Sequence, residues 1–134
     1  MWNRCRGAAT SYSRLPLDCT PTSVREAREA TRKWLGNVGR SVAVNPAALV
    51  VSELVTNSLI HARGPIVLHL WDEVDAVTVG VSDGSTTLAS ADPAQPGATS
   101  GRGMHIIERF ASRWGSEIGD SGKLTWAELP AAAT

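Results

Sequence analysis

Residues 50–62, VVSELVTNSLIHA, carry the pattern on which the interpretation of this chain depends. In an α-helix, Glu53, Asn57 and His61 follow one another at four-residue intervals and form one stripe. The rest of the segment is apolar nearly all the way round, as in a largely buried helix. A carboxylate one turn from an amide oxygen suits a base beside a hard cation such as Mg²⁺, which takes oxygen ligands. Taken alone, these residues favour a partly solvated polar stripe without chemistry over a catalytic site.

The composition excludes several classes of protein. The chain has 134 residues, a formal net charge of +0 and no basic field that would hold nucleic acid. Cys5 and Cys19 are too few for a disulfide framework or a zinc knuckle. The N-terminal arginines precede no apolar run, and no stretch reaches the ~18 apolar residues of a membrane span. We therefore expect a cytoplasmic protein that binds neither nucleic acid nor membranes.

The elements before and within the opening segment follow from start and stop signals. Residues 1–10 are expected to be a flexible N-terminus, and 11–18 an edge strand. A helix over 24–35 should begin at the hydroxyl residues 20–23, with Glu26 completing a capping box to Ser23, and stop at Gly36 or Gly39. A second helix should begin with Asn45 as its cap and Pro46 in its first position, and end near residues 63–65.

The second half of the chain alternates strands, loop and helix. Residues 66–71 and 76–82 predict a hairpin with an acidic turn at 72–75. A long loop follows over 86–103, then a helix over 104–114 and a hairpin of 117–118 with 124–129, turning at 120–122. This order predicts an α+β two-layer sandwich, a mixed but mostly antiparallel sheet with helices on one face, forming one domain over 11–130.

Three boxes in this order resemble the GHKL ATPases, the superfamily of gyrase, histidine kinase catalytic domains and anti-sigma-factor serine kinases. The N box is matched by E53-L-V-T-N57, continued by His61-Ala62, and the first glycine box by Asp83. The second glycine box is matched by G101-R102-G103-M104. The tail, R113-W114-G115 and then G122-K-L-T-W-A-E-L129, resembles the small RsbW-type anti-sigma kinases of actinobacteria. The resemblance covers roughly residues 15–129.

The resemblance implies a role for each matched residue. Glu53 would be the general base, Asn57 would coordinate Mg²⁺, and Asp83 would accept a hydrogen bond from the adenine amino group. Residues 84–103 would form the ATP lid. The remaining ATP-binding positions would be Gly101, Arg102, Gly103 and Met104, where the glycines let the backbone approach the phosphates and lead into a helix N-terminus.

The implied function is an ATP-binding regulatory serine/threonine kinase that uses Mg-ATP. Its partners would be an anti-anti-sigma protein of the STAS type, which it phosphorylates, and a sigma factor, which it sequesters. A homodimer is also implied, and Arg25 on the first helix is the expected partner-binding residue, with a solvated helix charge as the alternative.

The chain departs from the pattern in the first glycine box, where Ser85 and Thr87 occupy the glycine positions. Three alternatives therefore stay open. The protein would bind ATP and partners without transferring phosphate, or be a detached histidine kinase catalytic domain, or be a gyrase-like ATPase. The last two are less favoured, because no dimerisation helix fits in residues 1–10 and no coupling domains follow.

Overall fold

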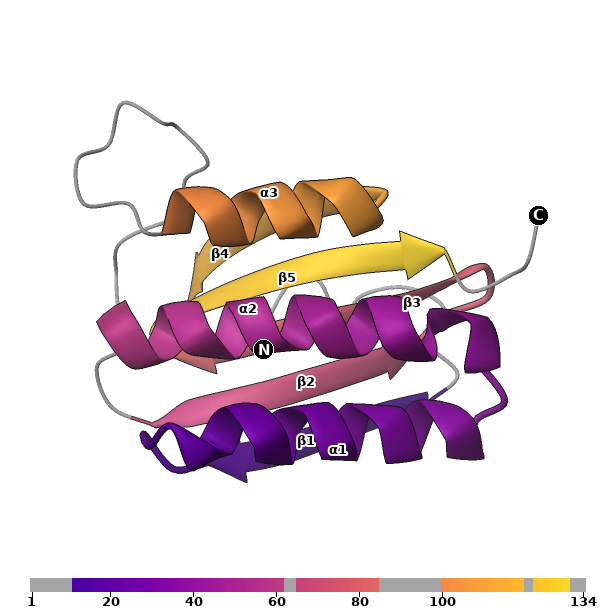
Figure 1. The fold of residues 1–134 in the computed structure, drawn as a ribbon, viewed down its shortest axis with the longest axis horizontal. Helices are drawn as coiled ribbons and strands as arrows, with labels where there is room; N and C mark the ends of the chain where they lie inside the picture. The colour runs from indigo at the N-terminus through magenta and orange to yellow at the C-terminus, as the bar shows by residue number, and fades with distance from the viewer. Residues whose placement is uncertain (1–10, 62–64, 85–99, 120–121, 131–134) are drawn as a thin grey trace.

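The computed structural model describes residues 11–61, 65–84, 100–119 and 122–130 (Figure 1). The predictions of a flexible N-terminus and of most of the lid, at 1–10 and 85–99, lie outside these residues. The elements, in chain order, are β1 Ser11–Leu17, α1 Thr22–Asn37, a 3-10 turn Ser41–Ala43, α2 Val44–His61, β2 Ile66–Asp72, β3 Ala76–Asp83, α3 Ser100–Phe110, β4 Arg113–Gly119 and β5 Gly122–Pro130.

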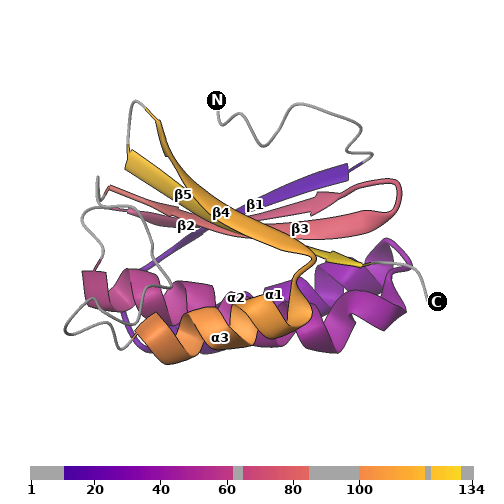
Figure 2. The ribbon, with the colours of Figure 1, turned by 90° about the horizontal axis from the view of Figure 1, so that it is seen from above.

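The described strands form one sheet in the order β1-β2-β3-β5-β4, and α1, α2 and α3 cover one of its faces (Figure 2). This confirms the predicted α+β sandwich and the edge position of β1. Each of the four strand pairings is antiparallel, so the described sheet contains no parallel pair. The pairings join two hairpins, β2–β3 and β4–β5, edge to edge, with β1 added along β2.

The core lies between the two layers. Strand residues alternate between the faces of the sheet, so Leu68, Val79 and Ala127 point toward the helices and are buried there. α2 lies between α1 and α3 (Figure 1) and supplies Val50, Val51, Leu54 and Val55 to this core. The stretch Ser41–Ile60 is long and apolar enough to cross a membrane by length and composition. A core helix of a folded domain passes the same test, and here that stretch packs against the sheet.

Two helix starts differ from the prediction. α1 begins at Thr22 with Pro21 at its cap and no side-chain cap, so the capping box is wrong. The Ser23 hydroxyl donates instead to the backbone carbonyl of Asp18. α2 begins at Val44, directly after the 3-10 turn, so Asn45 is not its cap. Both helices start earlier than predicted, because the turn before each one continues directly into the helix. At the end of α1, Gly39 adopts a φ of 79°, which confirms it as the predicted stop.

The predicted helix over 104–114 is wrong at both ends. α3 runs over Ser100–Phe110, and β4 begins at Arg113 and extends well before the predicted 117–118. The chain leaves the helix because the Ser112 amide donates to the Glu128 carbonyl of β5 at 2.7 Å. Position 115 of this strand favours glycine, because a Cβ there would come within 3.2 Å of the Trp126 ring.

Candidate functional site

Elements that are far apart in sequence meet at one end of the domain. The C-terminal half of α2, the end of β3, the start of β5 and the N-terminus of α3 lie at the same end (Figure 1). These elements carry Asn57, Asp83 and the predicted second glycine box. The fold therefore brings the predicted boxes to one end of the molecule.

Asp83 is the last residue of β3 and is 5% exposed. Its side chain is on the helix-facing side of the sheet, because the Ser58 hydroxyl of α2 donates to Asp83 Oδ2 at 3.1 Å. A buried carboxylate is stable only where hydrogen bonds or charges compensate its lost hydration. Ser58 supplies one such bond and orients the carboxylate beside α2.

The start of β5 packs closely against Asp83. Lys123 is buried and lies directly opposite Asp83 in the β3–β5 register. Gly122 has a φ of 144°, and a Cβ at this position would lie 1.8 Å from the Asp83 carbonyl oxygen. Only glycine allows this approach. Sequence reasoning missed these roles of Ser58, Gly122 and Lys123, because no local pattern shows which residue of β5 lies opposite Asp83.

Glu53 and Asn57 lie one turn apart on α2, and both are half-buried. Within the described part of the chain, neither side chain makes a hydrogen bond or an ion pair. A carboxylate and an amide that no described residue engages can both act on a ligand. The last residue of the stripe, His61, ends α2.

The side chains available as ligands determine what kind of metal site could form here. Among the described residues there is no group of three His, Cys, Asp or Glu side chains that would hold a metal ion by itself. Mg²⁺ commonly keeps several waters and binds one or two protein oxygens together with substrate phosphates. The Asn57 oxygen fits that arrangement, so a metal would arrive with a phosphate ligand.

The second glycine box falls inside α3. The sequence placed Gly101 and Gly103 in a loop before a helix starting at Met104, but α3 begins at Ser100 and contains all four box residues. The first backbone N–H groups of a helix have no partner within it and favour anions. The glycine box therefore contributes the amides of a helix N-terminus, and Arg102 lies among them in sequence.

Comparison with models of known protein families identifies the family of this chain. The family model described as the histidine kinase-like ATPase domain matches residues 17–129. The chain belongs to the histidine kinase-like ATPase family. A search of curated proteins finds no match.

Membership confirms the GHKL resemblance and implies that this domain binds ATP. As a histidine kinase-like ATPase domain, the chain has the end of the sheet beside α2 and α3 as its candidate nucleotide site, with Asp83 the buried acceptor there. Arg25 is not part of this site. It is exposed on α1, which flanks α2 on the side away from α3 (Figure 1).

Proposed function

We propose that this histidine kinase-like ATPase domain is a cytoplasmic regulatory serine/threonine kinase. In this proposal it uses Mg-ATP to phosphorylate an anti-anti-sigma protein of the STAS type and sequesters a sigma factor. The observation that carries the proposal is the pair Glu53 and Asn57, both half-buried, at the end of the sheet where Asp83 is buried. Neither side chain bonds to another residue that the structure describes. The tail segments 113–115 and 122–129, which resemble RsbW-type kinases, favour this branch of the family.

In the proposed reaction each residue has one task. Asp83, oriented by Ser58, accepts a hydrogen bond from the adenine amino group. Asn57 holds Mg²⁺, which when bound neutralises charge on the phosphates. Glu53 accepts the proton of the partner's serine hydroxyl as that oxygen bonds to the γ-phosphorus and ADP leaves. Amides at the start of α3 face the phosphates.

A second candidate is an ATP-binding, partner-binding module without phosphoryl transfer. Ser85 and Thr87 favour it, because they stand where the first glycine box has glycines. In both candidates the partner surface is the exposed face of α1. Arg25→Glu should then weaken capture of host proteins on the immobilised domain, whereas Arg109→Glu, the same change at an exposed position of α3, serves as the control.

The test separates chemistry from binding by comparing Glu53→Gln with Asn57→Ala. Glu53→Gln keeps the shape but removes the proton acceptor, so Mg-ATP should still bind while transfer falls by ~10²–10⁴-fold. Asn57→Ala removes a metal ligand and should weaken Mg-ATP binding itself. Calorimetry measures the binding, and transfer of labelled γ-phosphate to a STAS-type partner captured from the host measures the chemistry.

Glu29→Gln is the matched control, since it makes the same change at an exposed position of α1. It should leave binding and transfer at the wild-type level. Wild-type transfer by Glu53→Gln would remove Glu53 from the role of base. ATP binding by the wild type without transfer to any captured partner would favour the binding module over the kinase.

A further inference from the structure

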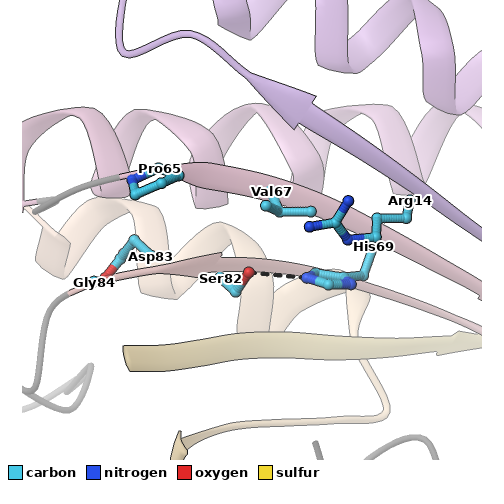
Figure 3. A pocket seen from close by; sticks show the side chains of 7 residues that line it. All are labelled: Arg14, Pro65, Val67, His69, Ser82, Asp83 and Gly84. Atoms are coloured by element: carbon cyan, nitrogen blue, oxygen red, sulfur yellow. Dashed lines mark hydrogen bonds between the residues drawn. The ribbon is translucent and has the colours of Figure 1, made fainter. Parts of the chain in front are cut away.

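A pocket of about 290 Å³ lies on the face of the sheet that the helices do not cover (Figure 3). It is lined by residues of β1, β2 and β3 and by the residues next to two strand ends: Arg14, Pro65, Val67, His69, Ser82, Asp83 and Gly84. Neighbouring strand residues point to opposite faces. The Asp83 carboxylate faces α2, whereas Ser82 and His69 face away from the helices. Asp83 therefore borders both places, but its carboxylate is bonded to Ser58 on the helix-covered face, and the pocket lies on the other face of the sheet.

Two of the lining residues, His69 and Ser82, belong to a hydrogen-bonded chain of three side chains that begins at Tyr12. The Tyr12 hydroxyl lies 2.7 Å from His69 Nδ1, and His69 Nε2 lies 2.9 Å from Ser82 Oγ. His69 is 4% exposed and its ring lies 5.5 Å from the Trp71 ring, at an interplanar angle of 8°. The imidazole is thus held in one orientation.

The chain of hydrogen bonds determines what Ser82 offers to a ligand. Burial, and secondly the Arg14 guanidinium, lower the pKa of His69 to about 4, so its ring is neutral at pH 7. A neutral imidazole donates from one nitrogen and accepts at the other. The phenol of Tyr12 is a stronger donor than an aliphatic hydroxyl, so we assign Nδ1 as the acceptor and Nε2–H as the donor to Ser82 Oγ. The Ser82 proton then remains to be donated into the pocket.

Arg14 adds a positive charge at the pocket. Its side chain is exposed, and it forms no ion pair or hydrogen bond within the described part of the chain. Figure 3 shows its guanidinium group beside Val67. Among the described residues that line the pocket, Arg14 is the cationic one, and the Asp83 carboxylate is turned toward α2. Val67 and Pro65 give an apolar surface beside Arg14.

We propose that this pocket binds a small organic monoanion, a carboxylate on a short apolar body. The carboxylate would pair with the Arg14 guanidinium and accept from the Ser82 hydroxyl, and the apolar part would contact Val67 and Pro65. A guanidinium group matches the two oxygens of a carboxylate. One cation suits a monoanion better than a phosphate group, which carries about −1.5 to −2 charge at pH 7. The volume is at the small end for ligand pockets.

The proposal is independent of the kinase function, and the probes distinguish the two. Isovalerate is the test ligand, isovaleramide its neutral match, and inorganic phosphate the alternative anion. NMR titration of the intact chain should show saturable shifts at His69 and Ser82 with isovalerate, and at least tenfold weaker binding of the amide and of phosphate. Saturating Mg-ATP should not displace isovalerate, since its site is on the other face of the sheet.

Variants locate the binding. Arg14→Gln and Ser82→Ala should each weaken isovalerate binding about tenfold or more, the usual loss of a hydrogen bond to a charged group. Arg32→Gln makes the same charge change on α1 and should leave binding unaltered. Arg14 and Arg32 are both exposed, so neither change should prevent folding. The NMR spectrum of each variant, compared with that of the wild type, checks this.

Four results would overturn the proposal: no saturable shift with isovalerate, equal binding of the amide, unchanged binding in both Arg14→Gln and Ser82→Ala, or displacement by Mg-ATP. Tighter binding of phosphate than of isovalerate would overturn the assignment to a carboxylate.

Discussion

At the scale of single residues, Asp83 is the position that should decide nucleotide choice. It is buried and oriented by Ser58, so an amino group on the base gains a hydrogen bond that a carbonyl group cannot make. Asp83→Asn should reduce ATP affinity by about 10- to 100-fold and remove the preference for ATP over GTP. Asp75→Asn, in the exposed β2–β3 turn, is the control. Calorimetry measures the affinities of each protein for ATP and GTP. Equal affinities in the wild type would contradict the role of Asp83 in nucleotide choice.

Also at this scale, His69 should make stability depend on pH. Its pKa is about 4 in the folded chain and 6.5 in an unfolded one, because burial disfavours the charged ring and Arg14 adds repulsion. Tyr12 and Ser82 face the ring as neutral groups. Between these two values the unfolded state binds the proton more readily, so this contribution is full above pH 6.5 and is lost as the pH falls toward about 4.

The measurement is urea unfolding between pH 7 and pH 4 on the wild type and His69→Gln. Glutamine can still donate and accept a hydrogen bond but does not titrate. The wild type should lose about 1–3 kcal/mol more unfolding free energy over this range than the variant. Parallel curves for the two proteins would show that His69 titrates alike in both states.

At the scale of elements, Gly122 joins the β4–β5 hairpin to the site. A Cβ there would lie 1.8 Å from the Asp83 carbonyl oxygen, and the φ of 144° disfavours other residues. Gly122→Ala should therefore lower the unfolding free energy by about 1–3 kcal/mol and weaken ATP binding, since β5 must move away from the end of β3. Gly36→Ala in α1 is the control, because its Cβ would meet nothing within 4 Å.

In the helix, alanine is favoured over glycine by about 0.5–1 kcal/mol, so Gly36→Ala should stabilise the protein. Urea unfolding compares the two variants. Equal stability of Gly122→Ala and the wild type would show that β5 does not need this close approach.

At the scale of the whole molecule, the candidate site is shared between the two layers. Asp83 and Lys123 come from the sheet, and Asn57 and Ser58 from α2. Because unfolding separates these layers, Mg-ATP should bind only the folded chain and stabilise it by about 2.7 kcal/mol at a concentration 100 times its Kd. Thermal unfolding should show this increase in the wild type and a smaller one in Asn57→Ala or with EDTA. An unchanged Tm at saturating Mg-ATP would place the nucleotide elsewhere or exclude its binding.

Local patterns in the sequence determined the fold class and several of the fold's elements. The buried stretch of α2 with its polar stripe, the β2–β3 hairpin and the edge strand β1 all follow from periodicity and turn residues, and the structure has them. The local sequence also predicts that Asp83 lies at the end of a strand. These features depend on neighbours within a few residues, so the sequence contains the information directly.

Tertiary structure decided what local patterns could not. It extended β4 and ended α3 four residues before the predicted end of that helix, because pairing with β5 at Glu128 outweighed the helical pattern of 104–114. It brought the Ser58 hydroxyl into a hydrogen bond with Asp83 and placed Gly122 and Lys123 next to Asp83. On the opposite face of the sheet it joined Tyr12, His69 and Ser82 by hydrogen bonds. Each of these contacts joins residues from different elements. Strand register and layer packing determine which of them meet, because a shift of one residue would turn every side chain to the other face.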